Sequence, residues 1–248
     1  MKNSILLFVF LLSFIQVSFS QKTCGTDLIL KKNLEQNPEK VLIRKQLEDL
    51  TKEFITTHRN NARMGQEYII PVVVHVLHLY GQENISDEQI ANGIELINQD
   101  FNAENDDLVD VIEEFSGITS DFGFEFRLAT IDPDGNCTHG ITRTATPITD
   151  GQDGAAKSVI SWDPQNYVNI WVIKEMSPGS SAAAYANYPG MGDPDGIVCL
   201  HDYFGSGVGT ASGGNWTRHT MPHEMGHFFN LAHPWGSTNE PGVQDNCG

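Results

Sequence analysis

The chain has 248 residues and a formal net charge of −17, a size that fits one catalytic domain with accessory segments. The charge is uneven, because residues 1–63 carry ten Lys/Arg and six Asp/Glu whereas residues 64–248 carry five and twenty-six. An acidic body of this kind makes nucleic acid and anionic membranes poor partners, and it leaves calcium binding open as an additional possibility.

Residues 1–20 predict a secretory signal peptide. Met1 and Lys2 form a short basic start, residues 5–17 form an apolar core, and Ser18 and Ser20 supply small residues at the cleavage positions. The core is too short for a comfortable membrane span, and no later stretch is apolar enough to cross a bilayer. We therefore expect a secreted, extracellular protein that has no membrane contact after the signal is removed.

Residues 21–63 predict a small basic segment ahead of the acidic domain. Pro38 opens a helical pattern in which apolar residues recur at spacings of four, three and four, namely Ile43, Leu47, Leu50 and Phe54. The polar stretch at 57–66 contains Gly65 and two arginines and is typical of an exposed linker.

Residues 64–248 predict one mixed α/β domain. The β-branched run from Tyr68 to Leu77 predicts a buried strand, and Ser86 with Gln89 forms a capping box for a helix whose apolar stripe is Ile90, Ile94, Ile97 and Phe101. Further strands are expected at 124–131, 168–173 and 197–200, followed by a glycine-rich stretch at 204–215.

The sequence HEMGHFFNLAH at 223–233 predicts a metal site. His223 and His227 are four residues apart, so on a helix they share a face and reach one metal ion. Thr220 as the N-cap and Pro222 in the first turn favour such a helix. His233 joins the two only if the chain turns back, and Asn230 is placed to take the left-handed conformation that such a turn needs.

Three imidazole ligands leave a tetrahedral zinc ion one open position, the arrangement of a catalytic site. Glu224, next to the first ligand, is placed to take a proton from a water molecule and to hand it to the leaving amine. The pattern therefore predicts a zinc-dependent peptidase with Glu224 as general base and acid.

Other functions remain open from the motif alone. The histidines can belong to a structural zinc site, to an exported adhesion or binding module without turnover, or to an amidase for non-protein amides. Glu224 argues against the binding module, because it is not a ligand in this pattern. Four other histidines of the domain are interpreted as structural or surface residues, namely His75, His78, His139 and His201. His219 is closer to the motif and could contact substrate, but a surface role is favoured.

The motif resembles the metzincin zinc motif H-E-x-x-H-x-x-G-x-x-H, with Asn230 in the glycine position. Shorter stretches resemble, in order, the pappalysin branch of the metzincins, which includes the ulilysin-like enzymes: CGT at 24–26, IPVVVHVLH at 70–78, FRLA at 126–129, GITR at 140–143 and NIWV at 169–172. The resemblance implies a secreted zinc endopeptidase that acts on proteins or peptides. It also implies a twisted mixed sheet with a backing helix and an active-site helix.

The resemblance further implies a latent precursor. Cys24 in KTCGTD is similar to the cysteine-switch element of pappalysin-type precursors, in which a thiolate fills the fourth zinc position. Cleavage near Arg59 or Arg63 would release the segment, so Cys24→Ser is expected to be active before processing. A disulfide is the alternative role for Cys24.

Two further expectations concern the end of the chain and the cysteines. Metzincins carry a methionine turn after the third histidine, but no methionine follows Met225, so we expect an N-terminal fragment whose lower subdomain is largely missing. Four cysteines allow three full pairings. If Cys24 serves the zinc site, Cys137 and Cys199 are free to pair, and Cys247 needs another partner.

Overall fold

The computed structural model describes residues 22–58, 67–234 and 236. The predicted signal peptide, most of the predicted linker and Cys247 lie outside these residues. Within them, no helix combines the length and the apolar character that crossing a membrane requires.

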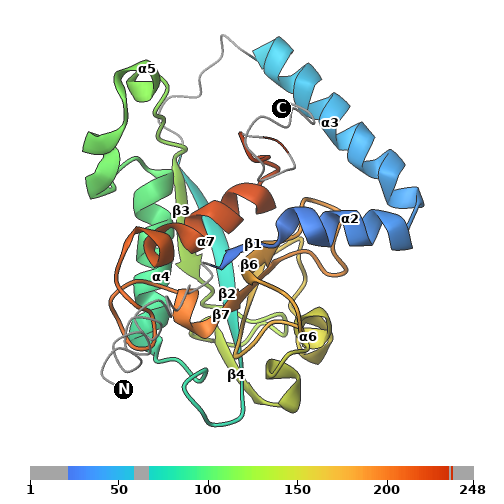
Figure 1. Cartoon of the computed structure of the whole chain (residues 1–248), viewed down its shortest axis with the longest axis vertical. Helices are drawn as coiled ribbons and strands as arrows, with labels where there is room; N and C mark the ends of the chain where they lie inside the picture. Colours follow the sequence, from blue (N-terminus) through green and yellow to red (C-terminus); the bar gives the residue numbers. More distant parts are fainter. Residues whose placement is uncertain (1–21, 59–66, 235, 237–248) are drawn as a thin grey trace, which may run out of the picture.

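A seven-stranded mixed sheet forms the centre of the molecule (Figure 1). The strand order is β1-β6-β7-β5-β2-β3, with β4 also paired to β2. All pairs are parallel except that of β6 with β7, so β6 runs against its neighbour. The strands are β1 (Thr23–Cys24), β2 (Tyr68–His78), β3 (Phe124–Leu128), β4 (Ile141–Ala145), β5 (Val168–Ile173), β6 (Ala182–Ala186) and β7 (Ile197–Leu200).

Alternate residues of the strands point to opposite faces, and both faces are buried. On one face Val74, Ile170 and Val172 belong to the core cluster that includes the apolar sides of the two long helices α4 (Asp87–Phe101) and α7 (Asn215–Phe228). On the other face Trp171 and Ile173 pack in a second cluster with residues of α6 (Asp153–Val159) and β7. The sheet therefore supports α7 from behind.

The predicted capped helix is confirmed as α4. Ser86 accepts a hydrogen bond from the backbone N–H of Gln89, and Ile90, Ile94 and Ile97 of the predicted stripe are buried. The Gln89 side chain does not return to Ser86, however. It donates to the carbonyls of residues 201 and 204 and thereby ties α4 to the loop that leads into α7.

Two helices precede β2, namely α2 (Thr26–Gln36) and α3 (Glu39–His58). The predicted helix after Pro38 is confirmed as α3, which has no buried residue and whose Leu50 and Phe54 are exposed. In Figure 1 the blue start of the chain, β1 and α2, lies beside the red helix α7. Four short helical segments lie in the connections. Two follow α4, η1 (Asp106–Asp110) and α5 (Glu113–Ser116), one follows β4, η2 (Pro147–Thr149), and one follows β7, η3 (His201–Tyr203).

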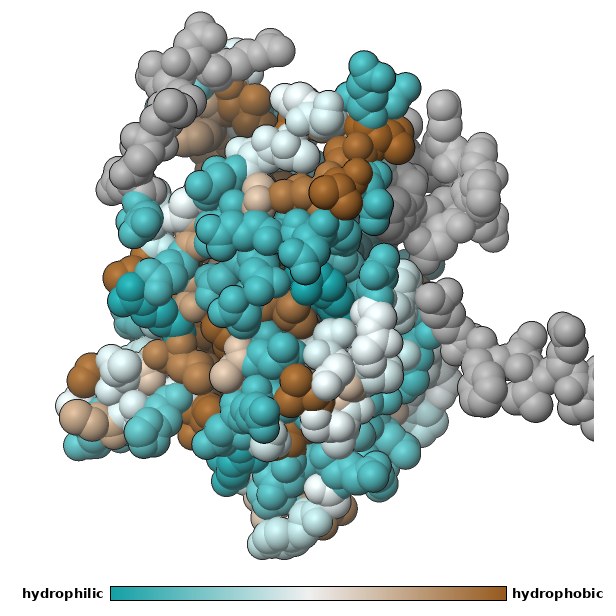
Figure 2. Space-filling view, turned by 90° about the vertical axis from the view of Figure 1, so that its left-hand side faces the viewer, coloured by the Kyte–Doolittle hydropathy of each residue, from teal (hydrophilic) through white to brown (hydrophobic). Residues whose placement is uncertain are grey.

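The face that carries α4 and α5 is mainly hydrophilic, with hydrophobic groups between (Figure 2). Several apolar side chains of the connection from α4 to β3 are exposed, and these are Val109, Ile112, Phe115, Ile118 and Phe122. A predominantly hydrophilic surface agrees with the strongly acidic composition of residues 64–248.

The mixed α/β class and the sheet with its two helices are confirmed, and several local expectations need correction. Helix α7 begins at Asn215, so Thr220 is not its N-cap and Pro222 lies inside it. The strand expected at 124–131 ends at Leu128. The pairing of Cys137 with Cys199, which the sequence left open, is not formed: both thiols are free, Cys199 buried within β7 and Cys137 exposed.

Candidate metal centre

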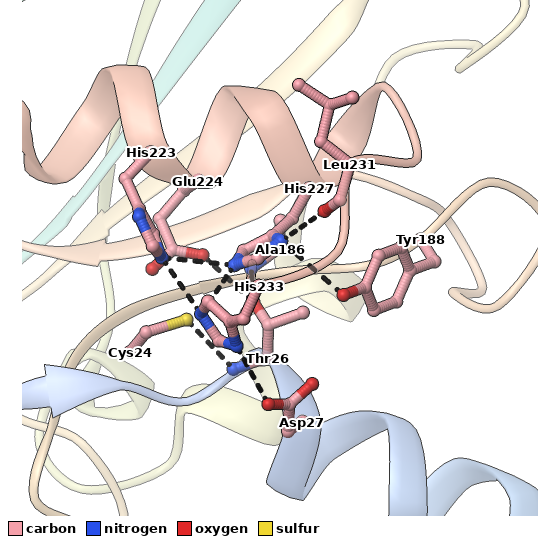
Figure 3. Close-up of polar contacts among 10 residues, drawn as sticks. All are labelled: Cys24, Thr26, Asp27, Ala186, Tyr188, His223, Glu224, His227, Leu231 and His233. Carbon is pink, nitrogen blue, oxygen red and sulfur yellow. Dashed lines mark hydrogen bonds and ion pairs between the residues drawn. The ribbon is translucent and has the colours of Figure 1, made fainter. Parts of the chain in front are cut away.

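Three imidazole rings converge at the end of α7 (Figure 3). His223 and His227 project from the helix with their Nε2 atoms 3.1 Å apart, as their spacing predicts. His233 follows the helix, and its Nε2 atom lies 3.1 Å from that of His223 and 3.0 Å from that of His227. The structure thus brings together the three residues that the sequence analysis selected as metal ligands.

The chain reverses at Asn230 to place His233. Asn230 has a φ of 73°, the left-handed conformation expected from its place in the motif. The backbone N–H of Asn230 bonds to the carbonyl of His227, and that of Leu231 bonds to the carbonyl of Gly226, which closes the last helical turn.

The donor set fits a zinc ion. Four tetrahedral ligands at about 2.0–2.3 Å from zinc lie roughly 3.3–3.8 Å from one another. The three Nε2 atoms are slightly closer than this at 3.0–3.1 Å, and the Sγ atom of Cys24 completes a group whose ligand atoms all lie within 4.8 Å of one another. Among the described residues no second group of three or more such side chains is placed to hold an ion, so calcium gains no support.

Hydrogen bonds on the far side of two rings orient them. The Nδ1 atom of His227 lies 2.6 Å from the carbonyl oxygen of Leu231, and the Nδ1 atom of His233 lies 2.9 Å from a carboxylate oxygen of Asp27. With Nδ1 donating, each Nε2 presents its lone pair to the centre. Burial lowers the pKa of His223 to about 4 and also lowers that of His227, so both rings are neutral at pH 7.

Glu224 follows the first histidine and is 1 % exposed. Burial raises the pKa of its carboxyl to about 7, although hydrogen bonds to the carboxylate oppose the shift. One carboxylate oxygen accepts a bond of 2.9 Å from the hydroxyl of Thr26. Glu224 is thus a buried acid beside the histidines, and its carboxylate is not one of the four grouped donors.

Residues 23–27, here called the covering segment, lie over this centre. Strand β1 pairs with β6 through bonds of 2.8 Å from Thr23 N–H to Ser181 O and 2.9 Å from Gly25 N–H to Ala184 O. A Cβ atom on Gly25 would lie only 2.9 Å from that of Ala182, so this close approach requires glycine. Cys24 is thereby held against the three histidines.

The next two residues reach the centre as well. Thr26 bonds to Glu224, and Asp27 bonds to His233, across 198 and 206 positions of sequence. The sequence analysis did not select either residue. Only their position in the sequence could have indicated them, because they directly follow Cys24 and Gly25 in the stretch CGTD.

Helix α3 contacts the turn after α7. The Arg44 guanidinium lies 4.2 Å from the ring centre of Tyr188, and it donates a hydrogen bond to the side chain of Asn230. The Tyr188 hydroxyl in turn lies 3.4 Å from the Nδ1 atom of His227. Both helices before the domain therefore contact groups around the candidate centre.

His219 lies one turn before His223 and lines the cleft beside it, together with Trp216 and Thr220. Its two ring nitrogens lie 2.6 Å from a carboxylate oxygen of Asp100 and 2.8 Å from one of Asp107. These bonds raise the pKa of His219, so the imidazolium form is favoured. The surface role expected for His219 is therefore too simple, because it ties α7 to α4 and η1.

Of the other histidines, His75 and His78 are buried in β2, as expected for structural residues. The ring of His201 bonds to the Thr210 hydroxyl at 3.0 Å. None of the three joins the candidate centre.

The sheet, the supporting helix α4 and a helix that carries two histidines before a left-handed turn to the third define a metallopeptidase fold of the metzincin type. A family model described as pregnancy-associated plasma protein-A matches residues 150–247. The chain belongs to this family, the pappalysins.

Solved structures of one protein, mirolysin, are similar to this chain along much of its length. Promirolysin of Tannerella forsythia, in a mutant form, is 30% identical with a TM-score of 0.69, covering 87% of this chain and 71% of that one. Mature mirolysin with a cleaved peptide is 33% identical with a TM-score of 0.61, covering 69% of this chain and 66% of that one. This chain therefore spans about two thirds of the mature mirolysin chain. No curated protein matched.

Proposed function

We propose that the protein is a secreted zinc-dependent endopeptidase that is made as a latent precursor. The observation that carries this proposal is the convergence of three Nε2 atoms within 3.0–3.1 Å beside a buried carboxyl that is not part of the donor group. Membership of the pappalysin family supports the same reading.

In this proposal His223, His227 and His233 hold the zinc ion. When bound, zinc supplies the charge that polarises a peptide carbonyl and acidifies a water molecule. Glu224 takes the proton from the attacking water and gives it to the leaving amine. A carboxylate that lies beside the ion without belonging to its donor group is suited to both transfers.

The proposed substrate is a protein or peptide chain in extended form. Strand β6 is an edge strand once β1 leaves it, so its free backbone groups can pair with a substrate as a further strand. Mature mirolysin was solved with a cleaved peptide, which supports a peptide substrate for this chain.

Latency in this proposal comes from the segment 21–63, ahead of a catalytic domain that begins near residue 64. Cys24 lies in the group of metal donors, and β1 occupies the edge of β6. Cleavage near Arg59 or Arg63, outside the described residues, would free the segment. The solved promirolysin precursor supports such an arrangement, and the predicted leader at 1–20 supports export.

The test replaces the carboxyl without removing the metal. Glu224→Gln is expected to abolish casein cleavage by the processed enzyme while zinc content stays at one ion per chain, because the residue handles the proton and not the metal. His227→Ala is expected to lose both. Glu95→Gln on the exposed side of α4 is the matched control and should retain both. Appreciable cleavage by Glu224→Gln would remove Glu224 from the mechanism.

A further inference from the structure

The hydroxyl of Thr26 bridges two groups of the catalytic domain (Figure 3). It donates to a carboxylate oxygen of Glu224 at 2.9 Å and accepts from the backbone N–H of Ala186 at 2.9 Å. The Thr26 residue is completely buried. One hydroxyl of the covering segment thus forms hydrogen bonds with both the carboxylate of the proposed general base and a backbone N–H of β6, the strand proposed to pair with substrate.

We propose that Thr26 is a masking residue for Glu224, so that latency has a component that does not depend on Cys24. This inference rests on the proposed peptidase function and adds to it the regulation of the same site. While Thr26 is in place, its hydroxyl occupies one oxygen of the Glu224 carboxylate, and Ala186 N–H is not available to a substrate carbonyl.

The contacts around Thr26 hold this arrangement whether or not a thiolate is present. Residues 23–25 pair with β6 through backbone bonds on one side of it, and Asp27 bonds to His233 on the other. The sulfur of Cys24 adds one contact, because it accepts from the backbone N–H of Thr26 at 3.5 Å, but the pairing with β6 and the bond from His233 to Asp27 do not involve it. Replacing Cys24 alone therefore leaves most of the contacts that hold Thr26 between Glu224 and Ala186.

Removing the Thr26 hydroxyl should weaken the masked state by a predictable factor. Valine has the same branched shape as threonine, so Thr26→Val leaves a buried carboxylate and a buried N–H without their partner while preserving the packing. A hydrogen bond to a charged buried group corresponds to a ~10- to 100-fold change in an equilibrium. The masked state should lose about this factor, and Thr26→Ser should restore it.

The experiment uses the full-length precursor with Arg59 and Arg63 replaced by alanine, so that the segment stays attached. Thr26→Val, Thr26→Ser, Cys24→Ser and the Cys24→Ser/Thr26→Val double variant are compared, with Thr26→Ala as a second deletion of the hydroxyl if the valine variant does not fold. Thr56→Val, on the exposed part of α3, is the matched control. Casein cleavage and amide hydrogen exchange at Ala186 are measured on each.

Cys24→Ser alone is expected to gain some casein cleavage, as the cysteine switch predicts, but to stay ~10-fold or more below the processed enzyme. The double variant is expected to cleave casein at least ~10-fold faster than Cys24→Ser alone. Exchange at Ala186 should become at least ~10-fold faster in Thr26→Val and stay at the wild-type rate in Thr26→Ser and Thr56→Val. Full activity of Cys24→Ser alone would overturn the proposal, and so would unchanged exchange in a folded Thr26→Val.

The two readouts separate this inference from the proposed function. A processed wild-type enzyme without casein cleavage would contradict the peptidase proposal, whereas the exchange at Ala186 would still report whether Thr26 protects the edge strand. Conversely, an active processed enzyme with unaltered exchange in Thr26→Val would overturn the masking role alone.

Discussion

Asp27 contacts the proposed zinc ligand His233 on the side of the ring that faces away from the metal centre. Its carboxylate accepts a bond of 2.9 Å from the Nδ1 atom of His233. A carboxylate in this position fixes the ring and increases its basicity as a ligand. Because this carboxylate orients His233, the precursor should bind zinc more tightly than a precursor that lacks the Asp27 carboxylate.

We therefore expect Asp27→Ala to weaken zinc binding by the precursor by ~10-fold, the lower end of the usual effect of such partners. Competition with a zinc chelator at pH 7.5 measures the dissociation constant. Glu35→Ala, an exposed carboxylate on the same helix α2, is the control and should behave as the wild type. Equal constants for all three proteins would show that Asp27 does not support the metal centre.

The spacing of residues predicted most of the candidate site. His223 and His227 were recognisable because four residues bring side chains to one helical face, and Asn230 because its left-handed turn lets His233 return. The roles of these residues and of Glu224 and Cys24 stay predictions. The sequence analysis missed Thr26 and Asp27 because their partners lie about two hundred positions away in the chain. No local sequence pattern predicts such a contact.

At the scale of elements, the strands with continuous apolar runs were predicted, whereas the short strand β4, the alanine-rich strand β6 and the two-residue strand β1 were missed. Val168–Ile173 and Ile197–Leu200 agree with the observed β5 and β7. Strand β6 reads AAAYA and lacks the residues favoured in strands, so its conformation depends on pairing with β7 and β1. Strand β1 has two residues and exists only through its pairing with β6.

The start of helix α7 was predicted wrongly because of its proline. Pro222 suggested a first turn, where its missing N–H does no harm, but the helix starts seven residues earlier at Asn215. A proline inside a helix leaves the carbonyl four residues before it without its usual donor. The packing of Met221 and Met225 into the core against the sheet offsets this loss.

Strand β2 contains a buried histidine that makes stability depend on pH. His75 is fully buried, and its Nε2 donates to Asn169 while its Nδ1 accepts from the hydroxyl of Thr142, so the neutral ring is satisfied by uncharged partners. Burial lowers the pKa of His75 from 6.5 to about 4. Between these values the unfolded chain binds a proton that the folded protein does not, so stability falls as the pH drops.

The expected loss from His75 is on the order of 3 kcal/mol between pH 7 and pH 4. Urea unfolding of zinc-free protein across this range measures it. His75→Gln, which cannot titrate, should have a lower stability at pH 7 but a pH dependence that is smaller by this amount. An identical pH dependence in both proteins would contradict a neutral buried His75.

At the scale of the whole molecule, the two ends of the described chain form one site. Residues 24–27 meet residues 223–233 across the edge of the sheet, so the groups proposed for catalysis and those proposed for latency are assembled only when the fold is complete. The charge distribution supports this docking, because residues 21–63 carry nine basic and six acidic residues whereas residues 64–248 are strongly acidic.

The central claim is that Cys24 and three histidines share one zinc ion in the precursor and that cleavage replaces the sulfur. X-ray absorption at the zinc edge tests this most directly, on full-length precursor and on the processed enzyme. We expect the precursor to show one sulfur at about 2.3 Å and three nitrogens at about 2.0–2.1 Å, and the processed enzyme to show nitrogen and oxygen only. A precursor spectrum without sulfur, or one unchanged by cleavage, would contradict the account.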